Sequence, residues 1–484
     1  MNRASAAVVK GLMRIGPELL PFADAATEEL PLGRLLRLSL FQVTVGMAVV
    51  LLIGTLNRVM IVELGVPSWI VALMLALPLL SAPLRTLVGF RSDHHRSVLG
   101  WRRVPFIWFG TMAQFGGFAI MPFAILILSG DAENGPIWEG QVAAAFAFLL
   151  VGAGLHTVQT VGLALATDLA PERARPRVVA LLCAMLLVGM VVSAVVFGFA
   201  LRNFGHVKLI QVVQGAAVVT IVLNSLALWK QEPRDFKPVA GASAIRFTQA
   251  WTTFSKVART RRRLVAIALG TAGFSMQDIL LEPYGGKILH LPVGATTALT
   301  AMLAAGAGIG LWIAARRLAG GADAHRVAGW VALVGVVAFV CVIIAAPAQY
   351  APAFGLGVAL IGLGGGLFAH GTLTASMAAA KPEERGLALG AWGAAQATAA
   401  GVAIAISGFV NDAGAKLAMQ GAFGDTLADP VTGFTLVYGL EILLLLATII
   451  AIGPLARRRS TPAEATAPGF RAVARVGLNP GGLQ

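Results

Sequence analysis

Two histidines lie deep inside long apolar runs of this sequence, where an imidazole has few partners. Each has a glycine four residues before it and a threonine four residues after it. The two sets are Gly152, His156 and Thr160, with Gln159 beside them, and Gly366, His370 and Thr374. Residues four apart share one face of a helix, so each run presents a glycine, an imidazole and a hydroxyl in a column. We call these sets the first and the second histidine column.

The histidine columns allow three interpretations, because an unpaired polar group in hydrocarbon costs several kcal/mol. The first is hydrogen bonding between helices, worth about 0.6 kcal/mol per bond on average. The second is a proton relay or a substrate contact in a transport pathway. The third is axial ligation of a metallo-tetrapyrrole, since neutral imidazole is a common metal ligand. The glycines would let a neighbouring helix or a flat ligand approach closely, so the residues alone leave all three open.

Polar residues also gather at the ends of two other apolar runs. They are Asn57, Arg58 and Glu63 in "GTLNRVMIVEL", and Gln277, Asp278, Glu282 and Tyr284 in "GFSMQDILLEPYGG". They form either paired charges at a membrane interface or two sides of one cavity mouth. For Arg58 we favour an interfacial side chain that snorkels to water. Gln277 and Asp278 remain candidates for binding a substrate or pigment.

Acids are scarce in the middle of the apolar runs. Glu441 is expected in the outer part of the last run, and Asp168 at the cytoplasmic end of another. A proton-coupled transporter is expected to keep ionisable acids near mid-membrane. The distribution therefore weakens ion coupling as an explanation without excluding it.

The elements that position these residues are transmembrane helices. The chain has 484 residues, of which 57% are hydrophobic and 12% charged, with a mean hydropathy of +0.80. Soluble chains carry about 25% charged residues, and only helices and closed barrels span lipid. Runs of this length predict an all-α polytopic membrane protein with twelve spans. These are expected near 38–62, 67–88, 104–129, 141–168, 177–200, 207–229, 264–281, 296–315, 327–346, 353–378, 386–409 and 434–456.

The spans divide into two related sets of six. "GLHTVQTVGLALATDLAPER" before the fifth span has a counterpart in "LFAHGTLTASMAAAKPEER" before the eleventh. We predict an N-terminal tail at 1–37, six-helix bundles at 38–229 and 264–456, a linker at 230–263 and a C-terminal tail at 457–484. The linker is predicted to contain an amphipathic helix, with Phe247, Trp251, Phe254 and Val257 on one side. Paired sextets are typical of the major facilitator superfamily, in which the substrate site lies between the halves.

The distribution of basic residues predicts the orientation. Of the 37 Lys and Arg residues, the loops between odd and even spans hold four, Arg202, Lys208, Lys287 and Lys416. Arg58 and Arg85 lie at span ends, and the others lie in the tails and the remaining loops. The positive-inside rule then places both termini in the cytoplasm. The net charge of +14 is thereby explained by membrane orientation, and no nucleic-acid partner is expected.

The loop "GFRSDHHRSVLGWRR" resembles the gating loop of the major facilitator superfamily. The residues that carry the resemblance are Gly89, Asp93, Arg96, Arg102 and Arg103. In that superfamily the loop locks one conformation through contacts between Asp and Arg. His94 departs from the pattern, because an Arg usually follows the Asp, and a plain positive-inside loop is the alternative.

Several stretches together resemble the PucC/LhaA family of purple phototrophic bacteria, a branch of the major facilitator superfamily. Besides the three quoted polar stretches, they include "GLHTVQTVGLALATDLA", "RPRVVALLCAML" and "GLFAHGTLTASMA". The resemblance runs from about Leu32 to Arg459, and "LPFADAATEELPLGRLLRLSLFQ" is nearer the LhaA branch.

The resemblance implies an assembly factor for light-harvesting antenna complexes, LH1 or LH2, which binds or delivers bacteriochlorophyll. The implied partners are the light-harvesting alpha and beta polypeptides, the reaction-centre core complex, bacteriochlorophyll biosynthesis enzymes and membrane lipid. The implied location is the intracytoplasmic photosynthetic region of the bacterial inner membrane. His156 and His370 then become candidate axial ligands of the chlorophyll magnesium, and we expect them to face a shared apolar crevice. No direct protein–metal site is expected otherwise.

Two other functions remain open from the sequence. One is a secondary transporter that moves a small solute by alternating access, and the other is an assembly scaffold that holds no pigment. No P-loop, Rossmann glycine pattern or nucleophile elbow occurs in the sequence. We therefore expect no enzymatic turnover.

Overall fold

The computed structural model describes residues 30–80, 88, 92, 97, 100–130, 136–171, 174–233, 258–379 and 385–456. Within them lie eleven helices long and apolar enough to cross a membrane, together with a shorter apolar helix, Ser68–Leu80. Residues 1–29 of the predicted N-terminal tail, the predicted C-terminal tail, the amphipathic helix of the linker, and Gly89, Asp93 and Arg96 fall outside the described residues. The fold class predicted from the sequence, an all-helical polytopic membrane protein, is confirmed.

The first helix group extends from the N-terminal side to Leu228. It comprises α2 (Leu32–Leu38), α3 (Leu40–Val49), η2 (Val50–Leu56), η3 (Val59–Glu63), α4 (Ser68–Leu80), α6 (Val104–Leu128), α7 (Ile137–Leu169), α8 (Arg175–Ala200) and α9 (His206–Leu228).

The second helix group extends from Ala258 to Ala456. It comprises α11 (Ala258–Ser275), η4 (Met276–Ile279), α12 (Leu281–Lys287), α13 (Val293–Ala319), α14 (Ala324–Ala348), α15 (Ala351–Ala378), α16 (Arg385–Met419), η6 (Asp425–Leu427) and α17 (Val431–Ala456).

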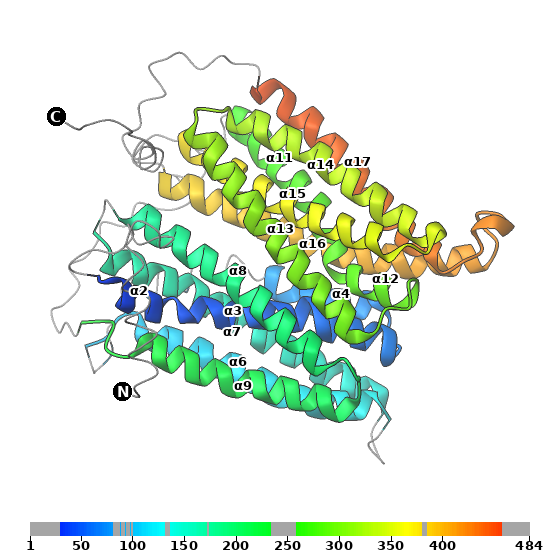
Figure 1. The fold of residues 1–484 in the computed structure, drawn as a ribbon, viewed down its shortest axis with the longest axis horizontal. Helices are drawn as coiled ribbons and strands as arrows, with labels where there is room; N and C mark the ends of the chain where they lie inside the picture. The colour runs from blue at the N-terminus through cyan, green and yellow to red at the C-terminus, as the bar shows by residue number, and fades with distance from the viewer. Residues whose placement is uncertain are drawn as a thin grey trace, which may run out of the picture.

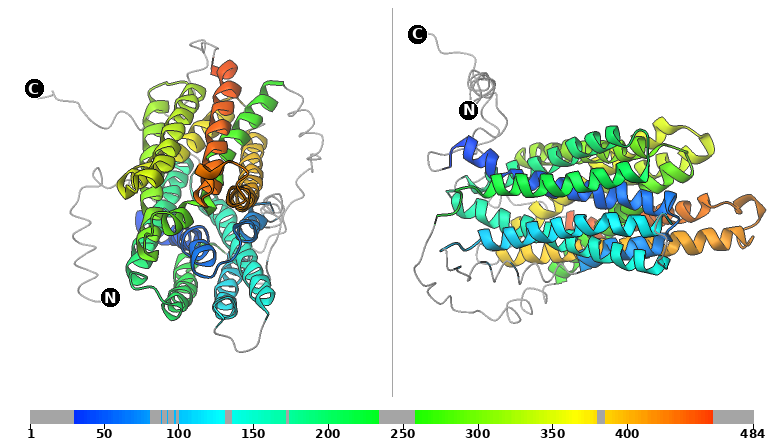
Figure 2. Two further views of the ribbon diagram at one scale, coloured as in Figure 1. Left: turned by 90° about the vertical axis from the view of Figure 1, so that its right-hand side faces the viewer. Right: turned by 90° about the horizontal axis from the view of Figure 1, so that it is seen from below.

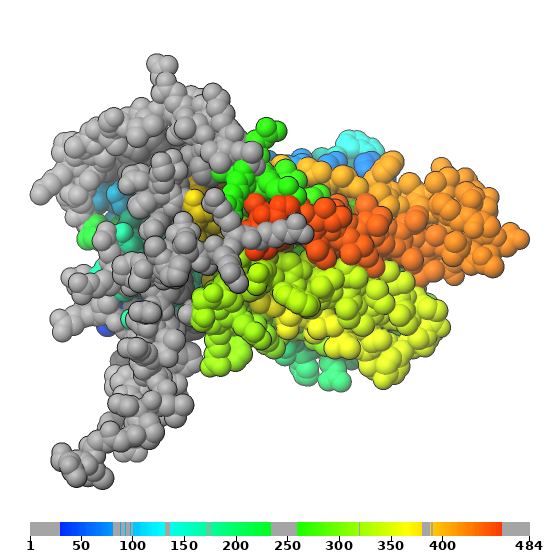
Figure 3. Space-filling model, turned by 90° about the horizontal axis from the view of Figure 1, so that it is seen from above, coloured from blue at the N-terminus to red at the C-terminus, as the bar shows by residue number. Residues whose placement is uncertain are grey.

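The two groups lie side by side with their long helices roughly parallel (Figures 1 and 2). We call the end where α2 begins and α17 ends the basic end, and the end where η3 stops at Glu63 the far end. The hairpin of α16 and α17 projects beyond the other helices at the far end (Figures 1 and 3). Large apolar side chains face outward, as expected in lipid; Phe109, Phe199 and Ile450 are each more than 70% exposed.

Two helix pairs join the groups along their length, α8 with α13 and α4 with α16. Glycine makes both contacts close. A Cβ on Gly294 would overlap the carbonyl of Gly198, and one on Gly408 would lie 2.6 Å from the carbonyl oxygen of Ser68. Small residues allow such backbone approach in membranes, where no hydrophobic force drives helices together.

Two spans depart from the straight helices that their apolar length predicts. The first changes from α-helix to π-helix at Val50 and again at Val59, and the seventh passes through a 3-10 turn at η4. The seventh span was predicted to end at 281, but α12 continues it to Lys287, with Glu282, Pro283 and Tyr284 buried. The prediction stopped short because a polar run was interpreted as an interface, whereas protein encloses it.

Candidate functional site

The two interrupted spans meet at the far end, where η2 packs against η4 and α13, and η3 packs against α12. We call this place, formed by η2, η3, η4 and α12, the broken-helix crossing. π-helical segments occur frequently at functional sites, and interrupted helices form the substrate sites of many transporters. The sequence marked this region by its polar residues, although it did not predict the breaks.

Asn57 links the two groups at the crossing. Its amide nitrogen Nδ2 donates to the carbonyl of Ile279 at 2.8 Å and to that of Asp278 at 3.4 Å. The hydroxyls of Thr55 and Thr297 lie 3.3 Å apart across the same boundary. All of these side chains except Asp278 are buried. The Asn57 side chain of the first span thus binds backbone carbonyl groups in the 3-10 turn of the seventh span.

Arg58 is enclosed by the crossing and does not snorkel to water, so that prediction was wrong. The residue is 3% exposed. Its guanidinium forms an ion pair with Glu63 and donates from Nη2 to the carbonyl of Leu291 at 3.2 Å. Gly286 of α12 packs against the guanidinium, and a Cβ there would lie 3.0 Å from Nη2. The arginine therefore joins the two groups from inside the protein.

Two acids near the crossing are also enclosed. Glu282 is 3% exposed, accepts a hydrogen bond from the Thr300 hydroxyl and lies against Gly54 of η2. Glu441 of α17 is fully buried and accepts the backbone N–H of Gln277 at 2.7 Å. The Gln277 side chain donates in turn to Asp278. Only the structure shows that Glu441 belongs with Gln277 and Asp278.

Tyr284 belongs to the core of the second group and does not line a cavity mouth. It is 1% exposed, and its hydroxyl donates to the Val342 carbonyl at 2.9 Å. Its ring packs against those of Phe354, Phe434 and Tyr438 at centroid distances of 5.4 to 5.5 Å. Its position next to the acids reflects packing of α12 against its neighbours.

The histidine columns lie on α7 and α15, and their imidazole and threonine residues are half-buried. Their glycines pack against different helices. A Cβ on Gly152 would overlap the ring of Pro78 in α4, and one on Gly366 would overlap the carbonyl of Ala307 in α13. The glycines thus serve helix packing. Whether the two imidazoles share one crevice does not follow from these glycine contacts, and it stays a prediction.

At the basic end, Arg102 and Arg103 of the predicted gating loop both bind Asp168 at the end of α7. Arg103 Nε lies 3.0 Å from the Asp168 carboxylate, and its Nη1 donates to the Ser92 hydroxyl at 2.7 Å. Glu232, beyond α9, accepts the backbone N–H groups of Arg102, Arg103 and Val104. Sequence reasoning missed Glu232, which carries no local signal beyond following a span.

The fold and the crossing of two interrupted helices define the class: this is a polytopic membrane protein with the major facilitator superfamily fold. Among solved structures it resembles a bacterial homologue of the human lysosomal transporter Spinster in its inward-facing, unoccupied conformation (TM-score 0.66, 14% identity, covering 89% of this chain and 98% of that one). It also resembles the nucleoside transporter NupG (TM-score 0.64, 13% identity, 87% and 99%). Likeness at this identity concerns the fold alone.

Sequence comparison gives the particular family. The profile described as PUCC protein matches residues 55–460, and the chain belongs to this family. It is 56% identical to "Protein PucC" of Rhodovulum sulfidophilum over 85% of this chain and 92% of that protein. It is 52% identical to the "Uncharacterized protein in puhA-bchM intergenic region" of Rhodobacter capsulatus over 90% and 92%. A more distant relative is the "Bacteriochlorophyll synthase 44.5 kDa chain" of Rhodobacter capsulatus, at 29% over 88% and 96%.

Proposed function

We propose that this protein is an assembly factor for light-harvesting antenna complexes, LH1 or LH2, which binds bacteriochlorophyll and delivers it to antenna polypeptides. The observation that carries the proposal is membership of the PUCC family over residues 55–460. A relative over most of the chain is named for bacteriochlorophyll synthesis. The partners are then the light-harvesting alpha and beta polypeptides, the reaction-centre core complex and bacteriochlorophyll biosynthesis enzymes.

The residues proposed to hold pigment are His156 and His370, with Gln159, Thr160 and Thr374 beside them. Each imidazole is half-buried, so a ligand can reach it from the surface of its helix. His156 and His370 would then hold the pigment through its magnesium, for which a neutral imidazole can serve as ligand. Because the glycines of the two columns contact different helices, α4 and α13, we propose that each histidine holds its own pigment.

The proposed location is the photosynthetic region of the bacterial inner membrane, with both termini in the cytoplasm. The basic end carries Arg34, Arg102, Arg103, Arg259 and Arg262, whereas the far end of the described residues carries few basic groups. The positive-inside rule assigns the basic end to the cytoplasm. Pigment would then be received and released where newly made antenna polypeptides enter the membrane.

The test is purification of the tagged full-length protein in mild detergent from phototrophically grown cells. We expect bacteriochlorophyll absorption, and antenna or reaction-centre subunits, in the purified fraction. A His156→Ala, His370→Ala double variant should retain partner subunits and lose pigment. Absence of pigment and of all these subunits from the wild-type protein would contradict the proposal. Unchanged pigment in the double variant would show that these histidines do not hold it, and normal antenna assembly by a protein that carries no pigment would favour a pigment-free scaffold.

A second candidate function, secondary transport of a small solute, is favoured by the enclosed acids at the broken-helix crossing. Glu282 and Glu441 are buried there beside interrupted helices, as in sites that couple transport to ions. Gln277 links Asp278 to Glu441, because its side chain donates to Asp278 and its backbone N–H to Glu441. Reconstituted vesicles that show solute flux in the wild type, and lose it in Asp278→Asn, would support transport. Vesicles with no flux of any tested solute class would count against transport and favour an assembly factor, with or without bound pigment.

A further inference from the structure

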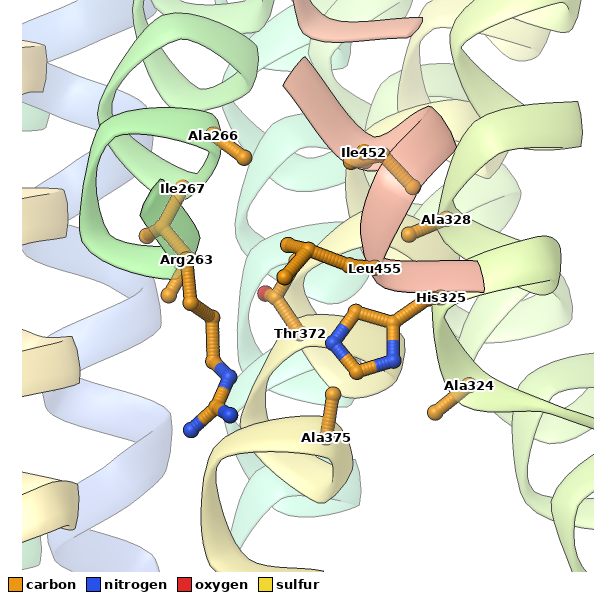
Figure 4. A pocket seen from close by; sticks show the side chains of 10 residues that line it. All are labelled: Arg263, Ala266, Ile267, Ala324, His325, Ala328, Thr372, Ala375, Ile452 and Leu455. Atoms are coloured by element: carbon orange, nitrogen blue, oxygen red, sulfur yellow. The ribbon is translucent and has the colours of Figure 1, made fainter. Parts of the chain in front are cut away.

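The small cavity at the basic end of the second helix group is too small to bind a ligand larger than a water molecule. It lies between α11, α14, α15 and α17, and apolar side chains form most of its wall (Figure 4). Its volume of about 10 Å³ is room for about one water-sized atom. The outer surface of the first helix group, by contrast, carries an extended feature on helix α9.

Helix α9 presents one continuous stripe of side chains to the surroundings of the protein. It lies beside α6 along the edge of the first group, on the side away from the second group (Figure 1). Residues at alternating steps of four and three share one face of a helix, and this is the spacing of a seam that a second helix covers. On α9 and the residue after it, this spacing selects Gln211, Gly215, Val218, Val222, Ser225 and Trp229. All of them are exposed except Ser225, which is half-buried. We call this set the α9 stripe.

Two glutamines place amide groups where lipid is expected. Gln211 lies on the α9 stripe and Gln214 beside it, and both residues are exposed. At a rise of 1.5 Å per residue, Gln214 lies about 12 Å along the helix from His206, within a hydrocarbon layer of about 30 Å. Neither amide forms a hydrogen bond within the described part of the chain. An amide that faces hydrocarbon without a partner is costly, and glutamine side chains hydrogen-bond between helices in membranes. The two amides therefore indicate a partner that brings a hydrogen-bonding group into the membrane.

Gly215 makes the backbone of α9 accessible at the level of these amides. A Cβ on this glycine would meet nothing within 4 Å. Small residues at such points allow two membrane helices to approach closely. Val218 and Val222 continue the stripe, and their β-branched side chains are stiff at χ1. They lose little freedom when a partner packs against them, so the stripe suits a helix better than mobile lipid chains.

Helix α17, the last long helix of the second group, shows an ordinary lipid-facing surface for comparison. Its exposed large side chains are those of Leu436, Leu443, Leu446 and Ile450. Gly439 is as open as Gly215, since a Cβ there would also meet nothing within 4 Å. Within Val431–Ala456, no exposed residue carries an amide or a charge. Exposed glutamines are therefore a particular property of α9 and are not shared by its counterpart.

We propose that the α9 stripe is the docking surface for one transmembrane helix of a partner protein. That helix carries a hydrogen-bonding side chain at the level of Gln211 and Gln214, and an acidic group at its far-side end, opposite Lys208. Lys208 lies one turn before Gln211, is exposed and forms no ion pair within the described residues. It is also the only Lys, Arg, Asp or Glu of α9. The inference rests on the chemistry of α9 and does not depend on the proposed function.

Lys208 also distinguishes this partner from a second copy of the chain. In a symmetric pair of copies the same surface patch faces itself, so two Lys208 side chains would lie on the same side of the membrane at one contact. Like charges placed together at a contact are unfavourable, and α9 contains no acid to balance them. A different helix with an acidic end satisfies the charge and the amides together.

The experiment measures association of the purified full-length protein with designed transmembrane peptides in phosphatidylcholine vesicles, by resonance energy transfer between a label on each. The probe peptide is an apolar helix with one asparagine near its middle, aspartates at one end and lysines at the other. One reference peptide has leucine in place of the asparagine, and a second has lysines at both ends. We expect saturable transfer with the probe, and association about threefold to tenfold weaker with each reference peptide.

Variants of α9 connect the association to the stripe. A Gln211→Leu, Gln214→Leu double variant and Gly215→Leu should each bind the probe about tenfold more weakly. Both place leucine toward lipid, so they should fold as the wild type does. Lys208→Gln should remove the preference for the probe over the peptide with lysines at both ends. The matched control is Gly439→Leu on α17, which should bind as the wild type does.

Three outcomes would overturn the proposal. The first is no saturable association of the wild type with the probe. The second is association that neither the glutamine double variant nor Gly215→Leu weakens, or that Gly439→Leu weakens equally. The third is self-association of the protein without peptide that the glutamine variant abolishes, because the stripe would then bind a second copy of the chain.

Discussion

The far end and the basic end of the molecule are held together differently. At the far end, hydrogen bonds cross between the helix groups, from Asn57 to Ile279, from Arg58 to Leu291 and from Trp69 to Asp412. At the basic end, the following contacts each lie within one group. Arg34 binds Gln231, Asp168 and Glu232 bind the start of α6, and Arg262 binds the end of α17.

Separating the groups at the far end would break the buried hydrogen bonds of Asn57 and Arg58 across the boundary, and unpaired buried polar groups are costly. The Arg58–Glu63 ion pair lies within the first group and would survive such a movement. Contacts between the groups therefore close the far end in this structure.

The largest loss of stability is expected from removing Arg58 at the far end. Arg58→Ala leaves Glu63 without its partner and the Leu291 carbonyl without a donor, and should cost about 3 kcal/mol of folding stability. The estimate takes the low end of the usual range because Glu63 is one-third exposed. The measurement is the melting temperature in detergent. Arg202→Ala, an exposed arginine at the same end, is the control, and an equal loss in both variants would contradict the assignment.

A methyl group at Gly54 should force the far end apart. Its Cβ would overlap the Glu282 carboxylate and lie 2.9 Å from the Thr300 hydroxyl, an overpacking that typically costs about 1–3 kcal/mol. In solubilised protein carrying Thr297→Cys, Gly54→Ala should raise the rate of maleimide labelling. The control is Gly116→Ala, where a Cβ meets nothing within 4 Å. Equal labelling in both backgrounds would show that the crossing does not seal this end.

Removing the amide of Asn57 tests the hydrogen bonds alone. Asn57→Ala should cost about 1 kcal/mol, since bonds of this kind between membrane helices contribute about 0.6 kcal/mol on average and up to about 1.7. Thr157→Ala removes a hydroxyl that bonds within its own helix, to the Ala153 carbonyl at 2.8 Å. Its melting temperature should change less than that of Asn57→Ala. The reverse order would mean that Asn57 does not join the groups.

The smallest effect is expected at the basic end. Asp168→Asn removes the charge partner of Arg102, whose side chain is 37% exposed, and of Arg103, whose side chain is 6% exposed. The amide oxygen can still accept a hydrogen bond and Arg103 keeps the Ser92 hydroxyl, so the loss of stability should be smaller than for Arg58→Ala. Asp168→Asn should leave labelling of Thr297→Cys at the far end unchanged, because its contacts stay within the first group. Faster labelling in Asp168→Asn would show that the two ends are coupled and that the contrast between them is incomplete.

Helix positions were predictable because the length of an apolar run is local information. Helix α9 spans His206–Leu228 where the sixth span was predicted at 207–229, and α14 spans Ala324–Ala348 where the ninth span was predicted at 327–346. The interruptions at η2 and η4 were not predictable, since they depend on packing between the two groups. Arg58 shows the same limit. A polar residue near a span end indicates an interface, unless another segment covers it.

The candidate site was predictable in its residues and not in its arrangement. The repeated spacing identified His156 and His370, and polarity identified Asn57, Gln277 and Asp278. Which helix each glycine contacts depends on the fold. The contacts of Gly152 with α4 and of Gly366 with α13 could therefore not be predicted from the sequence. Glu441 was likewise visible as a lone acid in an apolar span, while its partner Gln277 lies 164 residues away along the chain.

The central claim, that the half-buried histidines bind pigment, is tested most directly by titrating the purified protein with bacteriochlorophyll and recording its absorption. The account predicts saturable binding with a spectrum of ligated pigment, reduced by His156→Ala and by His370→Ala and lost in the double variant. His206→Ala, at the far-end start of α9, should bind as the wild type does. Equal spectra for the wild type and the double variant, or no saturable binding at all, would contradict it.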